Sequence, residues 1–348
     1  MKALILSERH TLSLVDRPRP EVVAPDDVVV RVLQTGICGT DRSILVGKFP
    51  GRPGVVMGHE SVGTVESVGS AVTTHRPGDR VVISTTVYCG ACPSCLRGDT
   101  NFCADKAGNE VGLDSDGAFA EYVRLPARLF HTVPDGMDPD RAVLVEPLAC
   151  VLNNLAAGQL RAGETAVVVG GGPMGVVCAM AAHHYGARVL LVEPDAYRRD
   201  RCRSLFTRPP VGGERFSAHA PTETALAACG DVVVDTVGGL LEQSLTYAAP
   251  RGRVVVMGYD SLATATVRPL DILLGGLRIV GAGDYNSAMF PRAIELARWL
   301  PLERLITHRF PLEEHAAALA ALAADPVAPG APATPGTPYS AHKVLFVP

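Results

Sequence analysis

The chain has 348 residues, of which 47% are hydrophobic and 20% are charged, and its formal net charge at pH 7 is −4. This length is sufficient for two packed cores of ordinary size, and the charge provides no positive field that would hold a nucleic acid or an anionic membrane. No apolar run reaches the roughly 18 residues needed to span a bilayer, and the N-terminus lacks a signal-peptide pattern, so we expect a cytoplasmic protein with no nucleic-acid or membrane partner.

From Lys2 to about Leu129 the sequence consists of short β-rich runs that are broken by glycine and proline. Runs of this length and spacing predict a β-barrel-like domain. The expected strands are 3–6, 27–33, 61–68, 80–84 and 118–124.

Two short motifs in this first part contain residue types that suit an open zinc site. Cys38 provides a thiolate, and His59 and Glu60 provide an imidazole and a carboxylate. Three such ligands leave a fourth position for water or a substrate oxygen. Each motif taken alone also fits a core cysteine or a turn, so the hypothesis depends on their combination.

Four cysteines follow with the spacing C-x2-C-x2-C-x7-C, in a lobe that we place at 86–105. Four thiolates that tight turns bring this close predict a closed, structural zinc site. The alternatives are an iron–sulfur cluster, whose bacterial motif has a different last gap, and disulfides or unligated thiols, which fit an odd total of nine cysteines less well. The predicted ligands are Cys89, Cys92, Cys95 and Cys103.

Glu146 lies in the apolar segment LVEPLACVLNN. An ionised carboxylate in such surroundings is costly unless a cation or a hydrogen-bond donor is close. Glu146 is therefore a second candidate for the carboxylate ligand of the open zinc site, beside Glu60. The alternative is a carboxylate at the start of a helix that faces water, because Pro147 suits a first helical position.

From Thr165 the pattern becomes strand, glycine turn, helix and strand, which predicts the start of a doubly wound parallel sheet. The turn fits G-x-G-x-x-G directly after a strand, so we expect it to bind the pyrophosphate of a dinucleotide at the start of the following helix. The residues of this motif are Gly170, Gly171, Gly172, Pro173, Met174 and Gly175.

The next strand ends in Glu193, which can accept a hydrogen bond from the ribose 2′-hydroxyl and would repel a 2′-phosphate. This favours NAD over NADP. Arg198 and Arg199 weaken the argument, because either can lie over the adenine or pair with a phosphate, although both also fit a solvated basic helix face.

Further strands are expected at 231–235, 253–257 and 277–280, followed by a helix at 290–299, a strand at 305–310, a helix at 312–324 and a last strand at 343–347. We assign this tail to the first domain. The predicted catalytic domain is therefore 1–150 with 285–348, and the dinucleotide-binding domain is 151–284. The segment 326–338, rich in proline, alanine and glycine, predicts an extended loop.

Taken together, these motifs resemble the zinc-containing medium-chain dehydrogenases and reductases, and the likeness covers nearly the whole chain. It is closest to the branch of polyol (sorbitol-like) and threonine dehydrogenases, in which Glu-Pro stands where other alcohol dehydrogenases carry a second cysteine ligand. The segments that carry the likeness are the Cys38 motif, Gly58-His59-Glu60, the four-cysteine lobe, 116–122, Val145-Glu146-Pro147 and the glycine turn.

The resemblance implies an α/β protein with a GroES-like catalytic domain, a Rossmann domain, and assembly as a homodimer or homotetramer. It implies a catalytic zinc on Cys38, His59 and either Glu60 or Glu146, besides the structural zinc. Thr40 would begin a proton relay, and Asp41 would orient His59. The expected cofactors are therefore zinc in both sites and NAD, with NADP as the alternative.

Three departures from this family pattern stand out. Ser43 replaces a histidine that continues the relay in many relatives, the region 204–223 lacks a common Leu-Gly-Ala-Asp turn, and the proline-rich segment is an insertion. The Ser43 change suggests a substrate other than sorbitol or threonine.

The expected reaction is hydride transfer between NAD(P) and a secondary alcohol or its ketone, with zinc lowering the pKa of the bound alcohol. The substrate would be a small hydroxylated molecule such as a polyol, sugar, amino sugar or aminocyclitol. The alternatives are a primary-alcohol or formaldehyde-type dehydrogenase and, in another class, a catalytically silent nucleotide-binding scaffold.

Overall fold

A computed structural model describes residues 1–8, 10–206, 215–323 and 341–348. Within these, two compact units form: Met1–Glu146 with the C-terminal part from Asn286 onward, and Pro147–Tyr285. The sequence placed the boundaries at 150 and 285. The proline-rich segment 326–338 and residues 207–214 of the second departure lie outside the described residues.

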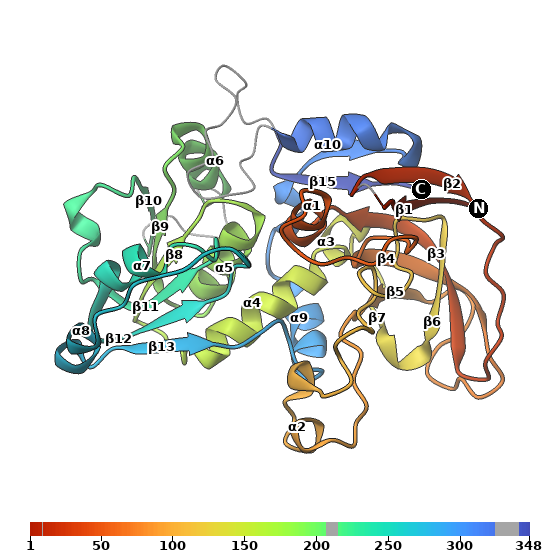
Figure 1. The fold of residues 1–348 in the computed structure, drawn as a ribbon, viewed down its shortest axis with the longest axis horizontal. Coiled ribbons are helices and arrows are strands. Elements are labelled where there is room, and N and C mark those ends of the chain that lie inside the picture. The colour runs from red at the N-terminus through yellow and green to blue at the C-terminus, as the bar shows by residue number, and fades with distance from the viewer. Residues whose placement is uncertain (9, 207–214, 324–340) are drawn as a thin grey trace. The chain divides into compact units, whose positions relative to one another are not determined.

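The first unit is built on a seven-stranded sheet, and a two-stranded sheet of β1 and β2 accompanies it (Figure 1). The order along the large sheet is β14-β15-β3-β4-β5-β7, and β6 also pairs with β3. The strands are β1 (Lys2–Leu6), β2 (Leu12–Asp16), β3 (Asp27–Gly36), β4 (Glu60–Val68), β5 (Arg80–Ile83), β6 (Tyr122–Pro126), β7 (Phe130–Thr132), β14 (Ile306–Phe310) and β15 (Lys343–Phe346). The helices are α1 (Gly39–Leu45), α2 (Pro93–Leu96), α3 (Pro139–Ala142), α9 (Met289–Ala297) and α10 (His315–Ala323).

The last strand of the chain, β15, lies in this sheet between β14 and β3. β15 pairs antiparallel with the end of β3, where Leu345 lies opposite Gly36. On the other side of β3, Gly36 lies opposite Glu60, the first residue of β4. This register places the start of β15, the end of β3 and the start of β4 side by side, although they come from opposite ends of the chain.

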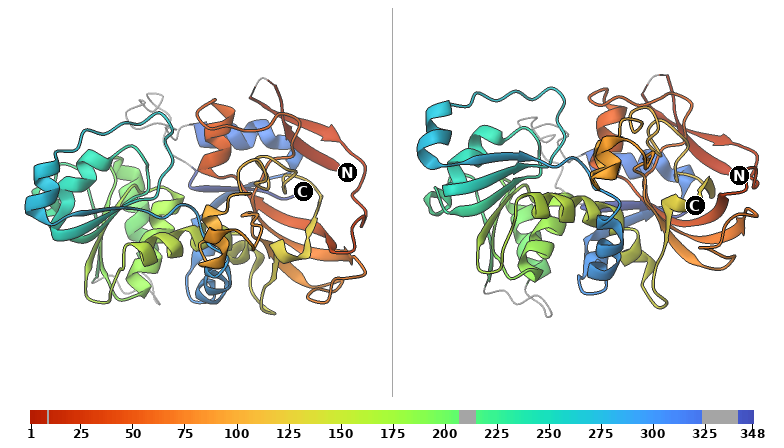
Figure 2. Two further views of the ribbon diagram at one scale, coloured as in Figure 1. Left: turned by 60° about the horizontal axis from the view of Figure 1, so that its bottom comes forward. Right: turned by 90° about the horizontal axis from the view of Figure 1, so that it is seen from below.

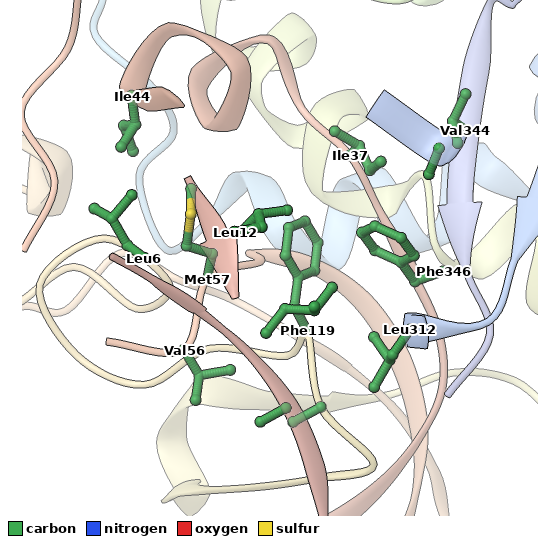
Figure 3. Packing of buried hydrophobic residues seen from close by; sticks show 14 of the residues in the cluster. Leu6, Leu12, Ile37, Ile44, Val56, Met57, Phe119, Leu312, Val344 and Phe346 are labelled. Carbon is green, nitrogen blue, oxygen red and sulfur yellow. The ribbon is translucent and has the colours of Figure 1, made fainter. Parts of the chain in front are cut away.

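One core of this unit is a cluster that includes Met57, Phe119 and Phe346 (Figure 3). The Phe119 and Phe346 rings meet edge to face, with centroids 5.1 Å apart, an arrangement that suits the charge distribution of aromatic rings. Phe119 also lies against Gly58, where an added Cβ would be 2.2 Å from the Phe119 ring. The core therefore fixes the backbone immediately before His59.

The second unit contains six strands that are all parallel, in the order β10-β9-β8-β11-β12-β13. Figure 2 shows helices on either side of this sheet. Since the chain begins in the middle and winds outward in both directions, the doubly wound parallel sheet predicted from the sequence is confirmed. The strands are β8 (Thr165–Val169), β9 (Arg188–Val192), β10 (Phe216–His219), β11 (Gly230–Asp235), β12 (Ala248–Val256) and β13 (Arg278–Gly281). The helices are α5 (Pro173–His184), α6 (Ala196–Phe206), α7 (Leu241–Tyr247) and α8 (Pro269–Gly275), and α4 (Val145–Ala157) runs across the division between the units.

The short strands β2, β7 and β10 were not predicted, because each of them is defined by its pairing with a neighbouring strand. Among the described residues, no helix has both the length and the apolar character needed to cross a membrane.

Candidate active site and zinc centres

Cys38 is positioned by the start of α1. It lies just beyond β3 and is the N-cap residue of the helix, in an extended conformation with φ −93° and ψ 160°. Its backbone N–H donates to Asp41 Oδ2 at 2.8 Å, and the Asp41 side chain is fully buried. Thr40 Oγ1 lies 3.7 Å from Cys38 Sγ. The predicted relay residue therefore stands beside the thiol.

His59 and Glu60 lie at the start of β4 and are buried, with exposed fractions of 6% and 1%. His59 Nδ1 lies 3.4 Å from Asp41 Oδ1, so Asp41 touches both His59 and the backbone of Cys38. Burial alone lowers the pKa of His59, but the negative charges of Asp41 and Cys38 outweigh it and raise the pKa well above 6.5. The surroundings of His59 thus attract positive charge.

Cys38, His59 and Glu60 form one group, in which the possible ligand atoms all lie within 4.8 Å of one another. A thiolate, an imidazole and a carboxylate are the ligand types of open zinc sites, so these side chains fit a catalytic zinc. Glu146 lies outside this group. It is in the first turn of α4 and is buried, with an exposed fraction of 8%.

Sequence reasoning missed Lys343, which lies at this same site. Its Nζ donates to Glu60 Oε2 and also to the backbone carbonyl of Ile37, the latter at 3.1 Å. Burial alone lowers the pKa of Lys343, but the charges of Glu60 and Cys38 raise it above 10.5, so the ammonium group keeps its proton. No local sequence motif predicts this contact, because 283 residues separate Lys343 from Glu60 and only the register of the strands brings them together.

The four cysteines of the lobe also form one group, with ligand atoms within 4.8 Å of one another. The Cys89–Cys95 and Cys92–Cys103 sulfur pairs are each 4.0 Å apart. This is close to the roughly 3.8 Å edge of a tetrahedron with zinc–sulfur bonds of about 2.3 Å, and it is far longer than a disulfide bond of about 2.05 Å. The lobe therefore fits a closed four-thiolate zinc site.

Backbone amides of the lobe favour ionised thiols. The Cys89 N–H donates to Cys103 Sγ at 3.2 Å, and backbone donors, first that of Ala104, lower the pKa of Cys92 to about 6. Burial, with the neighbouring thiols, raises the pKa of Cys95 to about 12. A bound cation is therefore needed to hold all four thiolates together.

The glycine turn joins β8 to α5, and its shape depends on close backbone contacts. Gly170 has φ +105°, a conformation that side chains rarely allow, and an added Cβ at Gly175 would be 1.9 Å from the Gly170 carbonyl oxygen. Gly172 is the N-cap of α5, with Pro173 and Met174 in the first turn. The N–H groups at this 12-residue helix start suit the binding of a pyrophosphate.

Glu193 lies beside this turn, at the end of β9. Its Oε2 accepts from the Gly171 N–H at 2.8 Å and its Oε1 from the Asp195 N–H at 3.0 Å. Arg198 Nη1 is 3.9 Å from Glu193 Oε2, whereas Arg199 donates to the Glu193 carbonyl at 2.8 Å. The carboxylate is held where a ribose is expected, with one arginine close to it.

Comparisons with known proteins find a matching family for each of the two units. Residues 24–135 match the alcohol dehydrogenase GroES-like domain family, and residues 173–299 match the zinc-binding dehydrogenase family. The 2-dehydro-3-deoxy-L-galactonate 5-dehydrogenase of Pseudoalteromonas atlantica is 34% identical over 86% of this chain and 89% of that protein. The L-threonine 3-dehydrogenase of Anaeromyxobacter dehalogenans is 32% identical over 90% of this chain and 93% of that protein.

Among solved structures, the chain is similar to a protein of Sinorhizobium meliloti 1021 that is described as a zinc-binding dehydrogenase bound to NADP. The TM-score is 0.86 and the identity 31%, over 100% of this chain and 99% of that one.

Proposed function

The chain belongs to the zinc-containing medium-chain dehydrogenases, with zinc and NAD(P) as its cofactors, and we propose that it oxidises a hydrophilic secondary alcohol or reduces the matching ketone. The observation that carries this proposal is the convergence of Cys38, His59 and Glu60 at an open ligand set, apart from the closed four-cysteine lobe. A closed set of four protein ligands would only stabilise the structure, because it leaves no open position on the metal for a substrate.

Cys38, His59 and a carboxylate would hold the catalytic zinc, which when bound would supply Lewis-acid chemistry at the substrate oxygen, while NAD(P) would supply the hydride chemistry. Thr40, whose Oγ1 lies 3.7 Å from Cys38 Sγ, would take up the substrate's hydroxyl proton and release its own hydroxyl proton outward, so that it acts as a relay. Asp41 keeps His59 in the orientation needed for metal binding. The third protein ligand is Glu60 or Glu146.

The proposed substrate is a polyol, sugar, amino sugar or aminocyclitol. Support comes from the relatives that are dehydrogenases of 2-dehydro-3-deoxy-L-galactonate and of L-threonine, both hydrophilic molecules. The carbinol carbon in threonine bears a methyl group, so that substrate is a secondary alcohol.

For the cofactor we propose a preference for NAD. Glu193, held by Gly171 and Asp195, would accept from a ribose 2′-hydroxyl and repel a 2′-phosphate. Arg198 lies close enough to pair with such a phosphate, which would instead favour NADP. The Glu193→Gln variant lacks the negative charge that repels a 2′-phosphate, so the ratio of kcat/KM with NADP to kcat/KM with NAD should rise at least about tenfold. An unchanged ratio would contradict the proposed preference for NAD.

We also propose assembly as a homodimer or homotetramer. Support comes from the edge strand β13 and the adjacent α8, which carry exposed apolar side chains that a second copy would cover. These residues are Leu270, Leu273, Leu274 and Ile279.

For the location we propose the cytoplasm. The clustered thiols of the four-cysteine lobe suit zinc binding, and disulfides are rare in that compartment.

The experiment is absorbance at 340 nm with NAD or NADP and a panel of secondary polyols, sugars, amino sugars and aminocyclitols, beside primary alcohols and formaldehyde. Turnover confined to secondary alcohols supports the proposal. Turnover confined to the primary alcohols or formaldehyde would favour a formaldehyde-type enzyme, and cofactor binding without turnover on any alcohol would favour a silent scaffold.

A further inference from the structure

Three side chains at the edge of the second unit's sheet form a chain of hydrogen bonds, and none of them belongs to the proposed zinc and cofactor sites. Ser217 Oγ lies 2.7 Å from His219 Nε2, and Glu223 Oε2 lies 2.6 Å from His219 Nδ1. A hydroxyl within hydrogen-bond reach of an imidazole that a carboxylate orients is the arrangement that activates a serine as a nucleophile. Ser217 therefore has the surroundings of a reactive hydroxyl.

The backbone of β10 places the serine and the histidine together. They are two residues apart on this strand, so their side chains point to the same face of the sheet. The ring of Phe216 stacks on Phe206 of α6, with centroids 3.7 Å apart, so the alternate residues of β10 face this helix. Ser217 and His219 consequently face away from α6, and Glu223 reaches back to them from the segment that follows the strand.

The hydrogen bonds define which atom carries each proton. The bond with His219 lowers the pKa of Glu223 below its ordinary value of 4.5, so at neutral pH this carboxylate is ionised and can only accept. Nδ1 of a neutral imidazole must then be the donor, which leaves Nε2 to accept the Ser217 hydroxyl proton. The Ala220 N–H donates to Glu223 Oε1 at 2.7 Å and holds the carboxylate in place. His219 is thus oriented to act as a general base towards Ser217.

The backbone beside Ser217 offers a donor for the oxygen of an attacked carbonyl group. β10 is the edge strand of its sheet, next to β9 (Figure 1). The Ala218 carbonyl accepts from Arg203 of α6, so the Ala218 N–H, which points to the same side of the strand, also faces the open edge. An N–H directly after the nucleophile can stabilise the negative charge that develops on the carbonyl oxygen. Because Ser217 is half-buried, we expect a small acyl group to fit best.

We propose that Ser217, His219 and Glu223 form a second, hydrolytic site that cleaves small carboxylic esters. This site needs neither zinc nor a nicotinamide, so it is independent of the proposed dehydrogenase function. Ser217 and His219 would be its catalytic residues, whereas Glu223 is a positioning residue because it acts through His219.

The proposed reaction has two steps. Ser217 Oγ attacks the carbonyl carbon and its proton passes to His219 Nε2; the bond from this carbon to the alcohol oxygen breaks, and the alcohol leaves with that proton. The acyl group stays on Ser217. A water molecule that gives a proton to His219 then attacks the acyl group, which leaves as a carboxylic acid, and Ser217 regains its proton.

The test uses the full chain and two reagents. p-Nitrophenyl acetate measures turnover through the p-nitrophenolate released. A fluorophosphonate, whose phosphorus binds an activated serine oxygen as fluoride leaves, marks the nucleophile for mass spectrometry. Wild type should hydrolyse the ester and carry the phosphonyl group on Ser217. Ser217→Ala should lose both properties, and His219→Gln should react at least about 100-fold more slowly, because a positioned general base contributes about 10²–10⁴-fold to a rate.

Two further variants separate the chemistry from folding, which circular dichroism checks in each variant. Glu223→Gln should lower kcat for the ester at least about tenfold and leave KM within about twofold, because Glu223 does not contact the ester. Ser204→Ala removes another serine of the same unit, whose Oγ donates to the Arg201 carbonyl at 2.7 Å, and it should leave turnover and labelling unchanged.

Wild-type protein can overturn the proposal even where a variant does not fold, because an unlabelled Ser217 after fluorophosphonate treatment would show that this hydroxyl is not activated. Ester hydrolysis that continues in Ser217→Ala would show that another group reacts. Equal labelling of Ser217 in wild type and His219→Gln would refute the role of His219 as the base. Hydrolysis that disappears in Cys38→Ser would assign the reaction to the zinc site instead.

Discussion

Gly172 and Gly175 belong to one glycine turn, yet an added methyl group meets different surroundings at the two positions. At Gly175 it would lie 1.9 Å from the Gly170 carbonyl oxygen, so the backbone must move. At Gly172 it would meet no atom within 4 Å, and the backbone there, with φ −72° and ψ −179°, suits alanine. Gly175→Ala should therefore destabilise the second unit by about 1–3 kcal/mol or more, whereas Gly172→Ala should change its stability by less than about 0.5 kcal/mol.

Cofactor binding should respond in another way. The Gly172→Ala methyl group would occupy space that the pyrophosphate needs. Loss of one hydrogen bond to a charged phosphate costs about 1.5–3 kcal/mol, so the Kd for NADH should rise roughly 10- to 150-fold.

NADH fluorescence gives the affinity, and urea unfolding followed by circular dichroism gives the stability. The single tryptophan, Trp299, lies in the first unit, so its fluorescence reports separately on that unit. Wild-type NADH affinity in Gly172→Ala, or an equal loss of stability in both variants, would refute the reasoning.

Three further predictions concern the first unit. Phe119→Ala removes a fully buried ring that packs on Phe346, so the free energy of unfolding should fall by about 3–5 kcal/mol; an unchanged midpoint in urea by tryptophan fluorescence would contradict the packing. Cys103→Ser should reduce bound zinc from two ions per chain to one by atomic absorption, and two retained ions would argue against the four-thiolate site. Burial, aided by His75, lowers the pKa of His131 from 6.5 to about 4, so the unfolded state binds the proton more tightly. Wild-type stability should be complete above pH 6.5 and fall by up to about 3 kcal/mol as pH drops to 4, whereas His131→Phe should lose this dependence; parallel pH profiles in urea would count against this assignment.

Much of the site could be predicted because its parts are contiguous in the sequence. The four cysteines lie within 15 residues, so tight turns alone bring their sulfur atoms together. The glycine turn follows a strand and begins a helix, and this local order already defines its shape. Here short-range geometry determines the structure.

Contacts set by strand register could not be predicted in this way. The Lys343–Glu60 pair exists because β15 returns beside β3. The choice between Glu60 and Glu146 was left open because the family resemblance allows either carboxylate, and only the fold brings Glu60 to Cys38 and His59. Likewise, no local pattern shows that Phe119 packs on Gly58 and supports the segment before His59.

The most direct test of the proposed function is the zinc content per chain of wild type and Cys38→Ser, measured together with cofactor reduction on a secondary alcohol. We predict two zinc ions and turnover in wild type, and one zinc ion without turnover in Cys38→Ser. A wild type with a single zinc ion, or a Cys38→Ser variant that keeps turnover, would contradict an open catalytic zinc site at Cys38.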